Sequence, residues 1–258
     1  MVYLVGAGPG DPELLTIKAL NVLKEAEVVI YDALVNPAVL EWTRRGCHRI
    51  CVGAPRSRRR LSQEEINRLL IEKGRRFSRV VRLKCGDPLV FARGIEEARA
   101  LVEAGLTFTI IPGVTAGVAA PACFGIPLTC RFLSSSVAFV TGHEAKGKNR
   151  KTDLLSLSRC VDTLVIYMGV GKIHELAKLL CRDLPNRSKP AAIIERGSWP
   201  DQKIHVTELQ KIASQDDLPG FRTPALIVIG DVVRLYSELR PYFVPLSGIP
   251  QFPEEVVG

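Results

Sequence analysis

The stretch "RLKCGDPLVFARG" (82–94) places a cysteine, a glycine and an aspartate directly after a basic, β-rich run. Cys85 at this point could be a nucleophile, a metal ligand or part of a binding loop. A nucleophile needs a base partner, and the neighbouring sequence offers none at a recognisable spacing. The seven cysteines are scattered without a CxxC pair, so no metal site is indicated. The third alternative, a position in a binding loop, stays open.

A second candidate loop is "GAGPGDP" (6–12), which follows a short apolar run. It suggests a dinucleotide-binding fingerprint, with Asp32 as the acid that binds the ribose. However, Pro12 disfavours helical backbone at Asp11, so a helix can hardly begin at the third glycine. Without a helix N-terminus there is no pyrophosphate site. The loop suits a ligand that lacks phosphate, and S-adenosylmethionine is such a ligand.

The net charge of +8 indicates an acidic partner, either nucleic acid or a polycarboxylate small molecule. The basic residues gather at 56–60 ("RSRRR") and 73–76 ("KGRR"), although the second run could also be a solvated face. Aromatic residues make up only 6% of the chain and do not interleave with these arginines, which argues against a single-strand nucleic-acid binder. No apolar run reaches membrane-spanning length and no signal segment is visible, so we expect a cytoplasmic protein.

Short β-rich runs that alternate with helical patterns must position these loops. This alternation predicts an α/β protein with mostly parallel or mixed sheets and helices on both faces. A small-residue stretch at 112–127 reads as a hinge followed by a packed helix, so we expect lobes at 1–113 and 114–242 and a peripheral tail at 243–258. The predicted strands are 2–5, 27–31, 49–52, 79–83, 107–111, 137–141, 163–168, 190–195, 203–206 and 225–230, and the predicted helices are 15–25, 37–44, 63–73, 95–104, 173–181 and 207–214.

Several motifs in order resemble those of the tetrapyrrole (class III) S-adenosylmethionine-dependent methyltransferases, over about residues 2–240. They are "GAGPGDPELLTIKA", "VVIYDALV", "VVRLKCGDPLVFARG", "PGVTA", "GIPLTCR", "VTGH", "VIYMG" and "TPALIVIG". The third and fifth are most similar to those of members that methylate uroporphyrinogen III. The resemblance implies a tetrapyrrole methylase fold, a homodimer, and a cofactor held in the cleft between two α/β domains. It also implies methylation of uroporphyrinogen III at C2 and C7 to give precorrin-2, with S-adenosylhomocysteine as the other product. This substrate carries eight carboxylates, which agrees with the basic net charge.

By motif position, the resemblance implies cofactor contacts along the chain. As one of these contacts, the Asp87 carboxylate would pair with the ammonium group of the cofactor. Met168 would pack on the adenine or beside the sulfonium, and its alternative is an ordinary core position. The implied contact residues are Pro9, Cys85, Gly86, Asp87, Val90, Thr115, Ala116, Met168, Gly197 and Ala225.

The family's candidate base is present as Asp32, which follows the second predicted strand. Its alternative role is an N-cap ahead of the helix in "NPAVLEW". Five arginines are candidates for the substrate carboxylates, and each is weighed against a surface salt bridge. They are Arg56, Arg58, Arg59, Arg93 and Arg131.

The sequence also departs from the family pattern near the expected active site. Ala54 replaces a lysine offered as proton donor, Ala33 replaces an arginine, and Cys130 replaces a histidine; Ala92 and Ile95 differ as well. Arginines after Ala54 could restore the charge but not the acid, because a guanidinium does not release its proton near neutral pH. Two alternatives therefore stay open: a sister methylase for another tetrapyrrole, and a non-catalytic homologue that binds tetrapyrrole or S-adenosylmethionine. Nucleic-acid binding ranks last.

Overall fold

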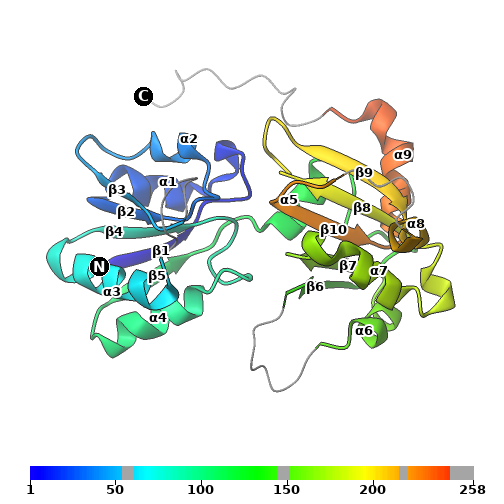
Figure 1. Cartoon of the computed structure of the whole chain (residues 1–258). Helices are drawn as coiled ribbons and strands as arrows, with labels where there is room; N and C mark the ends of the chain where they lie inside the picture. The colour runs from blue at the N-terminus through cyan, green and yellow to red at the C-terminus, as the bar shows by residue number, and fades with distance from the viewer. Residues whose placement is uncertain (54–60, 144–151, 215–219, 245–258) are drawn as a thin grey trace. The chain divides into compact units, whose positions relative to one another are not determined.

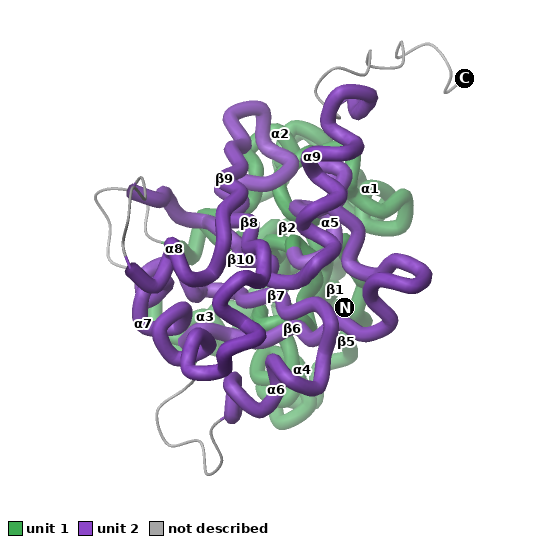
Figure 2. The backbone as a smooth tube through the Cα atoms, turned by 90° about the vertical axis from the view of Figure 1, so that its right-hand side faces the viewer, with its two compact units in different colours: residues 1–116 green, residues 117–258 purple. Residues whose placement is uncertain are grey.

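The computed structural model describes residues 1–53, 61–143, 152–214 and 220–244 (Figure 1). The chain divides into two compact units, residues 1–116 and residues 117–258, which are coloured separately in Figure 2. No helix within the described ranges is both long enough and apolar enough to cross a membrane.

Unit 1 is built on a five-stranded sheet in the order β3-β2-β4-β1-β5, and every pairing is parallel. Its strands are β1 (Val2–Gly6), β2 (Val28–Tyr31), β3 (His48–Cys51), β4 (Val80–Lys84) and β5 (Phe108–Ile111). Its helices are α1 (Ile17–Lys24), α2 (Pro37–Leu40), α3 (Gln63–Arg76) and α4 (Gly94–Glu103). One apolar cluster packs α1 and α2 on one face, and a second packs α3 and α4 on the other (Figure 1). Burial on both faces explains the nearly continuous apolar runs of these strands.

Local signals in the sequence set the starts of α1 and α3 in unit 1. Ser62 and Glu65 form the predicted capping box, in which each side chain accepts a hydrogen bond from the other residue's backbone N–H. Asp11 is extended, with φ −65° and ψ 122°, and α1 begins only at Ile17 after the N-cap Thr16. The glycine loop therefore leads into a short 3₁₀ helix at Pro12–Leu14 and does not open an α-helix, as the proline spacing predicts, so the loop lacks the α-helix N-terminus of the dinucleotide fingerprint.

Unit 2 contains a mixed five-stranded sheet in the order β6-β7-β10-β8-β9. Only the pairing of β6 with β7 is parallel, and the other three are antiparallel. The strands are β6 (Val137–Thr141), β7 (Thr163–Tyr167), β8 (Pro190–Glu195), β9 (Lys203–Glu208) and β10 (Ala225–Ile229). The helices are α5 (Ala116–Ala122), α6 (Leu154–Cys160), α7 (Ile173–Leu180), α8 (Leu209–Ser214) and α9 (Leu235–Leu239). Helices α6, α7 and α8 contribute to the core on one face, and α5 contributes to the core on the other.

The expectation of two α/β lobes with parallel or mixed sheets is confirmed, and the differences are local. The helix predicted at 37–44 ends at Leu40, because both the backbone N–H and the hydroxyl of Thr43 donate to the Leu40 carbonyl. The helix predicted at 207–214 begins at Leu209, because β9 continues to Glu208 opposite Pro190. Helices α6 and α9 are short and were not predicted.

Candidate active site

Three loops of unit 1 meet at the carboxyl edge of its parallel sheet. They follow β4, β1 and β5, which are neighbours in the sheet order. The loops after β1 and β4 are joined by two backbone hydrogen bonds: Gly86 N–H donates to Gly8 O at 2.7 Å, and Gly8 N–H donates to Gly86 O at 3.3 Å. The loop after β5 is joined to them by Asp87, whose Oδ2 accepts from Gly113 N–H at 3.1 Å. These contacts bring the unit 1 segments that carry Pro9, Cys85, Gly86, Asp87, Val90, Thr115 and Ala116 to one edge of the sheet.

Glycines permit this close meeting of loops. A Cβ on Gly6 would lie 2.6 Å from the Cα of Gly113, and a Cβ on Gly113 would lie 2.3 Å from the carbonyl oxygen of Gly86. Gly86 also has a φ of +70°, a region in which a side chain is strained. Larger residues at Gly6 and Gly113 would prevent this approach of the backbones, and Gly86 is needed for its positive φ, so these three glycines determine the shape of this edge.

Cys85 is a loop residue and not a catalytic thiol. It is absent from the residues with positive φ, and the neighbouring Gly86 takes that conformation instead, so the Cβ of Cys85 causes no backbone strain. Burial, together with the negative charge of Asp32, raises the pKa of the Cys85 thiol to about 11. The thiol is therefore protonated at neutral pH, and the nucleophile alternative fails.

Asp32 lies directly after β2, and its carboxylate remains partly accessible, with 33% of the side chain exposed. It does not cap α2, because the N-cap is Asn36, whose Oδ1 accepts from Ala38 N–H at 3.0 Å. The N-cap alternative for Asp32 is therefore wrong. Instead, Asp32 Oδ1 accepts a hydrogen bond from Arg82 Nη2 at 2.5 Å. The carboxylate is therefore held by Arg82 at the sheet edge and stays partly accessible to solvent.

Beneath Asp32 lies a cluster of charged side chains that sequence reasoning missed. Arg82 and Lys84 come from β4, Glu97 comes from α4, and none is more than 2% exposed. Arg82 and Lys84 are two positions apart on a strand, so they point to the same face. The sequence did contain a signal for this cluster, namely two basic residues at alternate positions of a central parallel strand. Both faces of such a strand are covered, so a charge on it is buried and needs a charged partner.

Three further predicted cofactor residues lie in unit 2, along one edge of its sheet. Met168 follows β7, Gly197 follows β8, and Ala225 begins β10, which runs antiparallel to both. Met168 has a φ of +52° and is 56% exposed, so the alternative of an ordinary core position is wrong. Gly197 packs closely on α5, where a Cβ would lie 2.3 Å from the Cβ of Ala120. A non-glycine residue held in the left-handed region, with its side chain exposed, is typical of a functional site.

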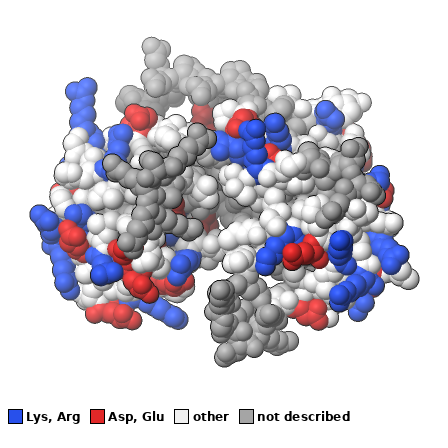
Figure 3. All heavy atoms as spheres, in the orientation of Figure 1, with Lys and Arg blue, Asp and Glu red and all other residues white. Residues whose placement is uncertain are grey.

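The arginines expected to bind substrate are not gathered by the described structure. Arg93 forms a two-pronged ion pair with Glu96, through Nε at 2.9 Å and Nη2 at 2.5 Å. Arg131 lies over the ring of Phe132, 4.9 Å from its centroid. On the face shown in Figure 3, Lys and Arg side chains lie among Asp and Glu in both units. Arg56, Arg58 and Arg59 fall outside the described residues, as does Ala54.

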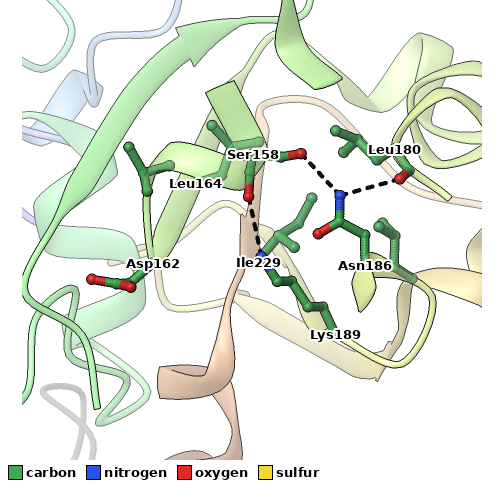
Figure 4. A pocket seen from close by; sticks show the side chains of 9 residues that line it. Ser158, Asp162, Leu164, Leu180, Asn186, Lys189 and Ile229 are labelled. Carbon is green, nitrogen blue, oxygen red and sulfur yellow. Dashed lines mark hydrogen bonds between the residues drawn. The ribbon is translucent and has the colours of Figure 1, made fainter. Parts of the chain in front are cut away.

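A small cavity in unit 2 takes no part in this site. It measures about 10 Å³ and is lined by residues of α6, β7, α7, α8 and β10 and of the segment before β8 (Figure 4). Asn186 Nδ2 donates to Ser158 Oγ at 2.9 Å, and Lys189 Nζ donates to Ser158 O at 3.2 Å. The space is no larger than a water molecule requires. These hydrogen bonds hold α6 to the segment between α7 and β8.

Comparisons with known proteins agree with this geometry. A family model described as tetrapyrrole (corrin/porphyrin) methylases matches residues 1–213. The uroporphyrinogen-III C-methyltransferase of Synechocystis is 43% identical over 248 residues, which covers 96% of this chain and 94% of that protein. A siroheme synthase of Saccharophagus degradans is 45% identical over 244 residues, but this chain spans only about half of its length (52%).

The chain is also similar to solved structures of tetrapyrrole methyltransferases. The uroporphyrin-III C-methyl transferase of Thermus thermophilus, complexed with S-adenosylhomocysteine, has a TM-score of 0.79 and 43% identity, covering 91% of this chain and 99% of that one. A cobalt precorrin-4 methyltransferase of cobalamin biosynthesis has the same TM-score at 26% identity, covering 90% of this chain and 95% of that one.

Proposed function

This chain belongs to the tetrapyrrole (corrin/porphyrin) methylase family, and we propose that it transfers two methyl groups from S-adenosylmethionine to C2 and C7 of uroporphyrinogen III, giving precorrin-2. The observation that carries this proposal is the 43% identity to a uroporphyrinogen-III C-methyltransferase over nearly the whole of both chains. The three joined loops of unit 1 and the accessible carboxylate of Asp32 supply the chemistry that this reaction requires.

The residues present fit S-adenosylmethionine. A ligand with an ammonium, a carboxylate and an adenosine needs a carboxylate partner, backbone donors and apolar surface. In unit 1, half-buried Asp87 and Val90 offer a negative charge and an apolar side chain three positions apart in the loop after β4. In unit 2, the exposed thioether of Met168 offers a polarisable surface that suits an aromatic ring or a sulfonium. We propose that these residues hold the cofactor together with Pro9, Cys85, Gly86, Thr115, Ala116, Gly197 and Ala225.

In this proposal the protein acts mainly by alignment. The bound cofactor supplies a methyl group on a sulfonium, and the pyrrole carbon of the substrate is already electron-rich. Holding the two reacting partners in line is worth about 7–11 kcal/mol in favourable cases. The loops of unit 1, which are fixed to one another through Gly8, Gly86 and Gly113, provide a rigid surface for this purpose.

Asp32 is the proposed general base. After the new carbon–carbon bond forms, the ring system must lose a proton to become neutral again. The carboxylate of Asp32 accepts this proton on an oxygen while Arg82 Nη2 keeps its hydrogen bond to Oδ1. The partly exposed side chain can then pass the proton to water. Arg93 and Arg131 are proposed to bind substrate carboxylates, and for Arg93 this requires exchange of its exposed pair with Glu96, which costs little.

The experiment is anaerobic incubation of the chain with S-adenosylmethionine and enzymatically made uroporphyrinogen III. A gain of two methyl masses supports the proposal, and an Asp32→Asn variant that still binds S-adenosylhomocysteine should lose that gain. No methyl transfer, despite cofactor binding, would refute the activity and favour a non-catalytic homologue. The Ala54→Lys variant should turn over faster if the missing lysine limits the rate.

A sister methylase for a later tetrapyrrole is the second candidate, because the cobalt precorrin-4 enzyme reaches the same TM-score. Incubation of the chain with precorrin-2 tests this alternative. Methyl transfer to precorrin-2 and none to uroporphyrinogen III would establish it.

We also propose that the chain is a cytoplasmic homodimer. The exposed apolar side chains of Phe132 (96%) and Leu133 (39%) in unit 2 support a dimer interface there. Light scattering after size-exclusion chromatography should give twice the chain mass, and Phe132→Ser should reduce it.

A further inference from the structure

Glu97 is a fully buried carboxylate that gathers two cations from the neighbouring strand. Its Oε1 accepts hydrogen bonds from Lys84 Nζ at 2.9 Å and from Arg82 Nε at 3.0 Å. Gln63 Nε2, at the start of α3, donates to the same oxygen at 3.3 Å. Oε2 has no hydrogen-bond partner among the described residues. A buried carboxylate is costly unless it is paired, so the two cations are what stabilise it here.

The same two cations also reach Asp32. Arg82 Nη2 lies 2.5 Å from Asp32 Oδ1, and Lys84 Nζ lies 3.9 Å from Asp32 Oδ2. The guanidinium is fixed further by Nη1, which donates to the Leu83 carbonyl at 3.1 Å. With both carboxylates ionised and both bases protonated, the two positive and two negative charges balance.

We propose that Glu97 is a positioning residue, which acts through Arg82 and Lys84 to hold the Asp32 carboxylate in place and to set the charge around it. This inference rests on the proposed function, in which Asp32 accepts a proton from the substrate. In that step a bond from hydrogen to the ring system breaks, its electron pair stays with the ring, and the proton goes to Asp32. The cluster then carries one excess positive charge, which a buried site disfavours. That excess charge drives the proton from Asp32 on to water and restores the base.

The titration of Lys84 is consistent with such coupling. Burial lowers the pKa of Lys84, and the neighbouring Arg82 lowers it further, while Glu97 and Asp32 raise it. The charge on Lys84 therefore depends on the two carboxylates. Other charged and titratable groups of the described structure lie around this cluster. With the cluster itself they are Arg82, Lys84 and Cys85 from β4 and its loop, Asp32 after β2, and Arg93, Glu96 and Glu97 at the start of α4.

The test measures the pH dependence of methyl transfer in charge-altering variants. Glu97→Gln keeps the shape of the side chain but removes a negative charge, so the acid limb of the kcat profile should move to lower pH by about one unit. Lys84→Met removes a positive charge, so the acid limb should move to higher pH. The double variant restores the balance and should bring the limb back towards that of the wild type. Misplacement of Asp32 should lower kcat about 10- to 100-fold in Glu97→Gln, with an unchanged KM for S-adenosylmethionine.

Two features of the design keep the inference falsifiable. Glu103→Gln, on the exposed end of α4, is the matched control and should leave kcat and the profile unchanged. If Glu97→Gln does not fold, the other two variants still test the inference. The acid limb should lie at higher pH in Lys84→Met and return towards that of the wild type in the double variant. A purely structural role would lower kcat without moving the limb in opposite directions.

The inference is overturned if Glu97→Gln and Lys84→Met leave the limb in place while the wild type and Asp32→Asn behave as the proposed function requires. A wild-type chain that transfers no methyl group to either tetrapyrrole would instead overturn the proposed function and this inference with it.

Discussion

The carboxylate of Asp87 accepts a hydrogen bond from the backbone of Gly113, 26 residues further along the chain, at 3.1 Å. Its other oxygen accepts from Leu89 N–H within its own loop, at 2.8 Å. One side chain therefore fixes the loop after β4 and ties it to the loop after β5. Asp87 has a structural role in addition to the cofactor contact that its motif implies.

We expect Asp87→Asn to destabilise the chain by about 1–3 kcal/mol. Two backbone donors face the Asp87 side chain, and an asparagine offers only one acceptor oxygen, so one N–H is left facing an amide NH₂. Urea unfolding measures the loss, and titration calorimetry with S-adenosylhomocysteine should show weaker binding. Asp231→Asn, which breaks an exposed pair with Arg234, is the control and should cost less than about 1 kcal/mol. Equal losses in both variants would contradict the bridging role.

Gly6→Ala should destabilise the chain by about 2 kcal/mol or more, because the new methyl would lie 2.6 Å from the backbone of Gly113 and the loops would have to separate. The control is Gly171→Ala in the second unit, where no atom lies within 4 Å of the added methyl. Thermal unfolding of both variants checks the expectation. Gly6→Ala with the stability and the cofactor affinity of the wild type would show that the loops do not need this close approach.

Replacement of Met168 should separate stability from affinity. Its φ of +52° costs a side-chain-bearing residue about 1 kcal/mol, and glycine avoids that cost. We therefore expect Met168→Gly to be more stable than Met168→Ala by about 1 kcal/mol, since alanine keeps the strained Cβ. Both variants lose the exposed thioether, so both should bind S-adenosylhomocysteine more weakly than the wild type. If affinity is unchanged in both, Met168 does not contact the cofactor.

Cys85 should resist alkylation by iodoacetamide at pH 8 far more than the exposed Cys160, because a thiol with a pKa of about 11 is almost entirely protonated there. Peptide mass spectrometry over a time course gives both rates. Labelling of Cys85 as fast as Cys160 would contradict the shift in its pKa.

The same shift predicts a dependence of stability on pH. The folded-state pKa of Cys85 is raised from its ordinary value of 9.0 to about 11. The folded state therefore holds the thiol proton more tightly than the unfolded state does. The contribution of this proton to the free energy of unfolding is complete below pH 9 and is lost as the pH rises to about 11. Over this window the free energy of unfolding should fall by about 2 kcal/mol more in the wild type than in Cys85→Ala. Urea unfolding at both ends of the window measures the difference, and parallel curves would contradict it.

The sequence by itself determined the features that depend on neighbouring residues. The capping box at Ser62 and the extended backbone at Asp11 follow from side chains and a proline within a few positions, so the start of α3 and the loss of the dinucleotide fingerprint were predictable. Short apolar runs that alternate with amphipathic patterns gave the strands and most helices. The ordered motifs named the family, and with it the segments that the structure brings to the sheet edges.

Only the tertiary structure decided what depends on contacts between distant residues. Strand order places the loops after β4, β1 and β5 side by side, and local sequence does not encode that order. The mixed sheet of unit 2, the exposure of Met168 and the raised pKa of Cys85 each depend on segments far apart in the chain. The pairing of Glu97 with Arg82 and Lys84 has the same origin. The sequence shows two basic residues on a strand and an acid on a helix, but burial turns them into one cluster, because charges removed from water must find one another.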